Sequence, residues 1–244
     1  MSSAKKSRVS DANAVLSTLK RLGSARIRDE MGPRYGIAAP PGAPALKAFG
    51  VPVGKLHDVA KRLGCDHELA LALWDTGWYE ARMLAAFVDE PARVTAAQMD
   101  RWARDFDNWG ICDTVCFHLF DRVPPPPHEL AFRKVEKWAG RNEEFVKRAA
   151  FALLASLALH HRPRDADEGL FLRCLPLIER AASDDRNFVK KGVSWALRGI
   201  GRRGPTLKAA AIKLARRLAA SPEAAAGGGG AQWVGKDVLK DLTR

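Results

Sequence analysis

Apolar residues recur at spacings of three and four along almost the whole chain, which is the periodicity of one face of an α-helix. Examples are Leu69, Leu73 and Trp74; Leu153, Leu154 and Leu157; and Ile212, Leu214 and Leu218. Alternating β-branched runs bounded by turns, which would indicate strands, are absent. The pattern therefore predicts an all-α protein.

Residues that commonly open helices set the expected boundaries, because Asp, Ser, Thr and Asn cap the free N–H groups of a first turn and Pro fits its geometry. Helices are expected to begin near Asp11, Pro52, Asp66, Thr95, Trp109, Pro127, Asn142, Ala166, Asp185, Pro205 and Gln232. Breaks are expected at 39–44 and 124–127. We expect a single domain over 1–244, with residues 1–10 disordered and a flexible glycine-rich loop at 224–231. A C-terminal helix over 232–244 should dock on the body through Trp233, Val238, Leu239 and Leu242.

One short motif occurs twice. Phe145-Val146-Lys147-Arg148-Ala149-Ala150 resembles Phe188-Val189-Lys190-Lys191-Gly192-Val193, 43 residues later, and Tyr79 to Ala85 is a weaker third copy. This period is typical of HEAT and armadillo repeats. Stacked helix pairs of this kind curve into a superhelix whose concave surface is built from the same helix of each repeat. We therefore expect a HEAT-like repeat superhelix, that is, an α-solenoid.

The charge of the chain favours a polyanionic partner. The 40 basic residues outnumber the 28 acidic ones, giving a net charge of +12. Between Arg133 and Arg217 there are 20 basic and 9 acidic residues, so this part carries nearly all of the excess. Basic residues in the first turns of the repeated helices would line one concave basic groove, where free backbone N–H groups add phosphate donors. The alternative, a solvated face of a scaffold, stays open at this point.

The cysteines and the apolar segments limit the class of protein. Cys65, Cys112, Cys116 and Cys174 form no CxxC pair. Cys112 and Cys116 could share a metal on one helix, but no neighbouring histidine pair completes a site, so buried thiols and no bound metal are expected. Neither a membrane-spanning apolar stretch nor a secretory signal is present. We expect a cytoplasmic protein, nucleoid-associated if bacterial, that acts as a compact monomer with no membrane and no obligate protein partner.

Trp109 and Asp113 are the candidate chemical residues. They are four apart, so a helix places them on one face about one turn from each other. A carboxylate beside an aromatic face suits cleavage of an N-glycosidic bond to a cationic base, because the carboxylate stabilises the positive charge that develops on the sugar. Asp113 could instead position the attacking water. An isolated pair of this kind is also consistent with a core tryptophan and an ion-pair partner.

Several motifs occur in an order and spacing that resemble a known family. They are Arg34-Tyr35-Gly36-Ile37; Phe49-Gly50-Val51-Pro52 with the helix that ends Ala60-Lys61; Leu73-Trp74 with Glu80-Ala81-Arg82; Trp109-Gly110-Ile111-Cys112-Asp113; Phe145-Val146-Lys147-Arg148; and Lys190-Lys191 with Trp195-Ala196-Leu197-Arg198. Over Gly32 to Arg217 the sequence resembles the DNA alkylation repair family of AlkD-type DNA glycosylases.

The resemblance implies a monofunctional enzyme without metal or organic cofactor that grips duplex DNA and releases N3- and N7-alkylated purines. It implies that Trp109 and Trp195 flank the lesion, that Asp113 is the catalytic carboxylate and that Arg148 lies near the backbone at the lesion. The expected DNA-binding residues are Lys61, Lys147, Lys190, Lys191 and Arg198. The main alternative is a non-catalytic HEAT-like module that binds DNA or a protein, and a second is an RNA-binding helical repeat.

Overall fold

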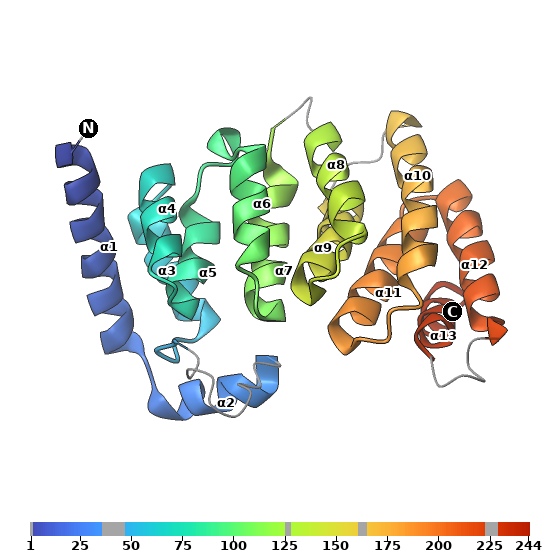
Figure 1. Ribbon diagram of the computed structural model, residues 1–244, viewed down its shortest axis with the longest axis horizontal. Helices are drawn as coiled ribbons and strands as arrows, with labels where there is room; N and C mark the ends of the chain where they lie inside the picture. The colour runs from blue at the N-terminus through green and yellow to red at the C-terminus, as the bar shows by residue number, and fades with distance from the viewer. Residues whose placement is uncertain (1, 36–46, 125–127, 161–164, 223–228) are drawn as a thin grey trace. The chain divides into compact units, whose positions relative to one another are not determined.

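The computed structural model describes residues 2–35, 47–124, 128–160, 165–222 and 229–244, and all regular elements in these ranges are helical (Figure 1). The elements are α1 (Ser2–Leu22), α2 (Ala25–Tyr35), α3 (Val53–Leu63), α4 (His67–Asp75), α5 (Tyr79–Val88), η1 (Pro91–Arg93), α6 (Ala96–Arg104), α7 (Trp109–His118), η2 (Phe120–Arg122), α8 (His128–Ala139), α9 (Glu144–His160), α10 (Asp165–Ala181), α11 (Asn187–Gly201), α12 (Pro205–Ala219) and α13 (Gly230–Leu242). The prediction of an all-α protein is confirmed.

The chain forms two compact units. The first contains Met1–Gln98 and Asp107–Arg122, and the second contains Met99–Phe106 and Val123–Arg244. Each unit has an apolar core of its own. The prediction that 1–244 acts as a single domain, and that its helices line a concave groove, stays a prediction.

The first unit is built around α5, which packs against α3, α4 and α7. Figure 1 shows α3, α4 and α5 gathered together. The core side chains of these helices, Leu56, Leu73, Trp74 and Leu84, are almost completely excluded from solvent. Burial of large apolar side chains of this kind contributes roughly 1.5 to 3 kcal/mol each. The core therefore fixes α7 on the apolar face of α5.

Glu80, on α5, is fully buried and holds the segment that precedes α3. Its carboxylate accepts hydrogen bonds from the backbone N–H groups of Phe49, Gly50 and Val51, at 2.9, 2.7 and 3.1 Å. Gly50 has a φ of 79°, and a Cβ atom there would lie 2.2 Å from the carbonyl oxygen of Ser24. Only glycine fits this turn without strain. The Phe49-Gly50-Val51 motif is thus a structural feature of the fold.

The second unit is built around the pair α9 and α11, with α8 against α9 and α13 against α11 and α12. The core side chains Phe151, Leu154, Val193, Leu197 and Val238 are fully buried. α9 and α11 carry the two copies of the repeated motif. The copies thus lie on neighbouring helices, as expected for stacked helical repeats.

Several predicted helix starts are confirmed by their caps. The Asp66 side chain accepts a hydrogen bond from the Leu69 N–H at 3.0 Å and begins α4. Thr95 accepts one from the Gln98 N–H at 3.1 Å and begins α6. These side chains satisfy N–H groups that have no partner within the helix. Local capping chemistry therefore sets these boundaries.

Other boundaries differ from the prediction. α1 begins at Ser2, whereas we expected disorder over 1–10 and a helix from Asp11; lysine, alanine and arginine in this stretch are good helix formers. α2 was not predicted, because Gly32 and the polar residues around it interrupt the apolar period. α5 was not predicted as a separate helix, because apolar spacing continues across Gly77, where a φ of 71° ends α4.

Predictions for the breaks are only partly covered by the structure. The expected break at 39–44 and residues 125–127 of the proline run lie outside the described residues, as do residues 224–228 of the glycine-rich loop. The end of that loop is described. Gly230 and Ala231 are buried and belong to the first turn of α13, so the helix starts before the expected Gln232.

Candidate functional site

Trp109 and Asp113 lie on α7 of the first unit, one helical turn apart as predicted. The helix is started by Asn108, which is fully buried and accepts a hydrogen bond from the Ile111 N–H at 2.9 Å. Ile111 and Cys112 are buried, whereas Trp109 and Asp113 are both partly exposed. The helix thus places the aromatic ring and the carboxylate on its partly solvent-facing side. The catalytic role of this pair stays a prediction.

Cys116, on the same helix as Asp113, is held as a thiol. Cys112 and Cys116 are fully buried, as expected, whereas Cys65 is exposed, contrary to that expectation. Burial raises the pKa of Cys116 well above its usual value, and the neighbouring thiol of Cys112 and the charges of Asp113 and Asp121 raise it further. A thiol is a poor nucleophile and a poor metal ligand. The chemistry available on α7 is therefore that of the carboxylate and the aromatic ring.

Arg148, on α9 of the second unit, ties the two copies of the repeated motif together. Its guanidinium donates a hydrogen bond to the backbone carbonyl of Phe188, at the start of α11, at 2.7 Å. The rings of Phe145 and Phe188, which occupy equivalent positions in the two copies, have centroids 5.4 Å apart. Arg148 is 6% exposed, so it has a structural role whatever else it contacts.

Lys147, next to Arg148, is held by an ion pair. Its Nζ lies 2.8 Å from the Asp184 carboxylate, and 16% of its side chain is exposed. Arg186 binds the same carboxylate and donates to the Asn142 carbonyl. Hydrogen bonds from Arg186 hold the pKa of Asp184 well below its usual range against the effect of burial, and Lys147 lowers it further. The ion pair with Asp184 holds the ammonium group of Lys147 in place, which does not favour its predicted role on DNA.

One pocket of about 350 Å³ in the second unit gathers four of the predicted residues. Its lining residues are Arg148, Lys191, Trp195, Arg198, Trp233 and Asp237. They come from α9, α11 and α13, so positions up to 89 residues apart in the chain meet here. Three cations beside an indole ring can bind a phosphate and an attached sugar or base at the same time. This pocket is the candidate nucleic-acid site of the second unit.

Two of its residues were not predicted as site residues. Trp233, expected to dock α13 on the body, is 37% exposed instead, and the Lys190 Nζ lies 5.7 Å from its ring centroid. The docking stripe of α13 consists of Ala231, Val234, Gly235, Val238 and Leu242, with Leu239 partly exposed. Trp233 falls one position outside this stripe, so the helical period could have shown that it faces away from the core.

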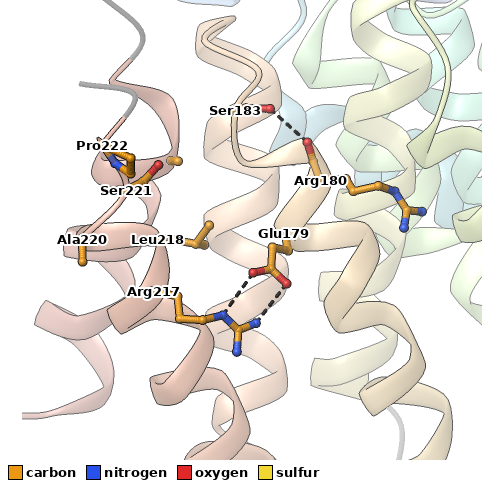
Figure 2. A pocket seen from close by; sticks show the side chains of 9 residues that line it. Glu179, Arg180, Ser183, Arg217, Leu218, Ala220, Ser221 and Pro222 are labelled. Carbon is orange, nitrogen blue, oxygen red and sulfur yellow. Dashed lines mark hydrogen bonds and ion pairs between the residues drawn. The ribbon is translucent and has the colours of Figure 1, made fainter. Parts of the chain in front are cut away.

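A second pocket of the same unit, about 420 Å³ in volume, is drawn in Figure 2. There Arg217 of α12 points at Glu179 of α10 and donates two hydrogen bonds to its carboxylate, at 3.1 and 2.9 Å. An arginine paired in this fork-to-fork manner has one edge of its guanidinium, formed by Nε and one Nη, occupied by the carboxylate. This pocket is therefore a weaker candidate for phosphate than the pocket around Trp195.

The predicted residues thus fall into separate groups. Lys61, in the last turn of α3, is exposed and belongs to the first unit with Trp109 and Asp113. Arg148 and Trp195 belong to the second unit with the other predicted DNA-binding residues.

Among the described residues, no group of three His, Cys, Asp or Glu side chains is arranged to hold a metal ion. None of the described helices is both long enough and apolar enough to cross a membrane.

The chain is an all-helical repeat protein with a pocket lined by three cations and two indole rings. Residues 15–224 match the family described as DNA alkylation repair enzyme, so the chain belongs to that family. It is therefore a member of a DNA repair family, as the sequence motifs predicted. No match is found among curated proteins.

A comparison with solved structures supports the same fold. The chain is similar to a structure described as "A new family of proteins related to the HEAT-like repeat DNA glycosylases with affinity for branched DNA structures". The TM-score is 0.69 at 20% sequence identity, covering 84% of this chain and 81% of that chain. At this identity the similarity concerns the fold alone, and it confirms the prediction of HEAT-like repeats.

Proposed function

We propose that this protein binds duplex DNA and hydrolyses the N-glycosidic bond of cationic N3- and N7-alkylated purines. The observation that carries the proposal is the gathering of Arg148, Lys191, Trp195 and Arg198 around one pocket in a chain of this repair family. Three of these residues are cations, and Trp195 offers an aromatic face beside them. Such a surface complements a nucleotide better than it complements an apolar ligand.

In this proposal Asp113 acts on the sugar. An alkylated purine already carries a positive charge and leaves readily, so the main demand is stabilisation of the oxocarbenium-like transition state. A partly exposed carboxylate on α7 can supply this negative charge, or it can orient the attacking water. Trp109, one turn earlier, can hold the cationic base by a cation–π contact of roughly 0.5 to 2 kcal/mol. Both residues are accessible enough for such contacts.

The phosphate contacts are assigned to the cations that are accessible. Lys191 is exposed and Arg198 is partly exposed, and both line the pocket with Trp195. Lys190 is partly exposed and lies over the ring of Trp233. Lys61 is exposed on α3 and is a further candidate. Lys147 is omitted because its ammonium group is paired with Asp184. Arg148 is retained, since it lines the pocket while holding the Phe188 carbonyl.

The second candidate function is DNA binding without base release. It is favoured by the description of the structural neighbour, which names affinity for branched DNA. A HEAT-like protein could use the same cationic pocket on a junction, because phosphate contacts carry no sequence information. The two candidates differ only in whether a glycosidic bond is broken.

The experiment is release of 7-methylguanine and 3-methyladenine from methylated duplex DNA, with Asp113→Asn and the matched control Asp58→Asn, an exposed carboxylate on α3. The proposal expects release by the wild type and by Asp58→Asn, and a loss of several orders of magnitude in Asp113→Asn with duplex binding retained. Full release by Asp113→Asn would remove its catalytic role. No release by any variant, with tight binding to a four-way junction, would favour the second candidate.

A further inference from the structure

α13 lies outside the residues that match the repair family, which end at 224. It is nevertheless an integral part of the second unit. Val234 and Val238 are completely buried. Gly235 faces α12 so closely that a Cβ atom there would lie 2.4 Å from the backbone nitrogen of Ala219 and 2.5 Å from the Ala215 carbonyl oxygen. The helix therefore has one tightly specified position.

The far end of α13 is fixed as well. Arg202, after α11, binds Asp241 with a 2.6 Å ion pair. A Cβ atom on Gly201 would lie 2.4 Å from the Leu242 side chain, so the two helices are in close contact there. With both ends held, residues on the opposite face of α13 have defined positions.

That opposite face presents Trp233 and Asp237, one turn apart, to the pocket that contains Trp195. Asp237 accepts a hydrogen bond from the Ser194 hydroxyl at 2.5 Å. It also lies 3.6 Å from the Nε of Arg198. The wall contributed by α13 is therefore an indole ring and a carboxylate that is anchored to α11.

Trp233 is unusual for its size and exposure. At 37% exposure it keeps a large apolar surface in contact with water beside the cations Lys190 and Lys191. An exposed indole next to cations is the arrangement by which proteins stack a base or sugar while binding its phosphate. Nothing in the packing of α13 requires a tryptophan at this position, because the docking stripe consists of other residues.

We propose that Trp233 contacts DNA directly, as a second aromatic wall of the pocket opposite the α11 residues. The occupant is one deoxynucleotide, with its ring or sugar against the indole and its phosphate near Lys191 and Arg198. This inference rests on the DNA binding of the proposed function and does not depend on base release.

The test measures the affinity of the full chain for a fluorescently labelled duplex that contains one uncharged abasic-site analogue. Trp233→Leu keeps an apolar side chain without an aromatic face, and Trp233→Phe keeps a smaller aromatic one. Loss of one base-stacking contact is expected to weaken binding by about five- to one-hundred-fold in Trp233→Leu. Trp233→Phe should bind within a few-fold of the wild type. The matched control is Leu172→Ala, since Leu172 is also 37% exposed in this unit and lies on α10, away from the pocket.

Wild-type affinity in Trp233→Leu would overturn the inference, as would an equal loss in Leu172→Ala. Salt dependence separates contact by the indole from contact through Lys190. Trp233→Leu should leave the slope of log affinity against log salt unchanged, because no charge is removed. A slope reduced as far as in Lys190→Ala would show that Trp233 only orients that lysine. If the wild type binds DNA but releases no base, the glycosylase proposal fails while this test stands.

Discussion

The Nζ of Lys147 lies 2.8 Å from the carboxylate of Asp184, a residue 37 positions later in the chain. This ion pair does not favour the DNA contact predicted for Lys147, because an ammonium group held by a carboxylate gains less from a phosphate. In the second copy of the motif the equivalent residue, Lys190, has its Nζ 5.7 Å from the centroid of the Trp233 ring and is partly exposed. The next residue, Lys191, is exposed.

Lys191→Ala and Lys147→Ala should therefore differ. We expect Lys191→Ala to weaken duplex binding and to reduce the salt slope by up to about one unit, as for loss of one phosphate contact. Lys147→Ala should leave the slope unchanged and instead lower the free energy of unfolding, because it leaves Asp184 without one of its partners. Duplex titrations over a salt series and urea unfolding of both variants check this. Equal slopes of log affinity against log salt for the two variants would contradict the assignment of the phosphate contact to Lys191 and not to Lys147.

Asp237→Asn should bind DNA more tightly than the wild type. The substitution removes a negative charge 3.6 Å from Arg198 and keeps an oxygen that can accept from Ser194. We expect a gain of about two- to fivefold in duplex affinity and a salt slope that is steeper by up to about one unit. The matched control is Asp241→Asn, the same change of net charge on the same helix, outside this pocket. An equal gain in both variants would show a general charge effect and not one of the pocket.

Asp100 should make stability depend on acid pH. Burial raises the pKa of this carboxyl, but hydrogen bonds from Lys134, Lys137 and Trp138 outweigh it and lower the pKa to about 2. Because the pKa is about 3.9 in an unfolded chain, the stabilisation is present above pH 4 and is lost as the pH falls toward 2. A pKa lowered by this much corresponds to a stabilisation of about 2 kcal/mol at neutral pH. In urea unfolding between pH 7 and pH 2, the free energy of unfolding should change less with pH in Asp100→Asn than in the wild type. Identical pH profiles for the two proteins would contradict the lowered pKa of Asp100.

Gly235→Ala should unfold more easily than the wild type. The added methyl group would lie 2.4 Å from the Ala219 backbone nitrogen, which can move only if α12 and α13 separate. Overpacking of this kind costs about 1 to 3 kcal/mol. Gly54→Ala is the matched control, since nothing lies within 4 Å of a Cβ atom there, and alanine in a helix is favoured over glycine by about 1 kcal/mol. Thermal unfolding that ranks the two variants in the opposite order would contradict the packing of α13.

The features that could be predicted from the sequence are those set by local chemistry. The caps at Asp66 and Thr95 were predicted because a side chain and an N–H three residues later are enough to form them. The repeated motif was visible because both copies keep the same apolar register. The pairing of Lys147 with Asp184 could not be predicted, because only the folded contact of α9 with the start of α11 brings these residues together.

Trp233 shows a different limit. Its helix was predicted, but all of its large apolar residues were assigned to docking. The buried side of α13 includes two tightly packed glycines, Gly230 and Gly235, which hydrophobicity alone does not mark as core positions. A large apolar residue beside such a stripe is left partly in water, where it is available to a ligand.

The carboxylate of Glu80 also links the dynamics of two segments that are distant in sequence. It is the shared acceptor for the amides of Phe49, Gly50 and Val51. These three amide protons can exchange with solvent only when Glu80 leaves them, and Glu80 is part of α5. Hydrogen exchange at the three amides thus reports separation of the segment 49–51 from α5, the helix against which α7 packs.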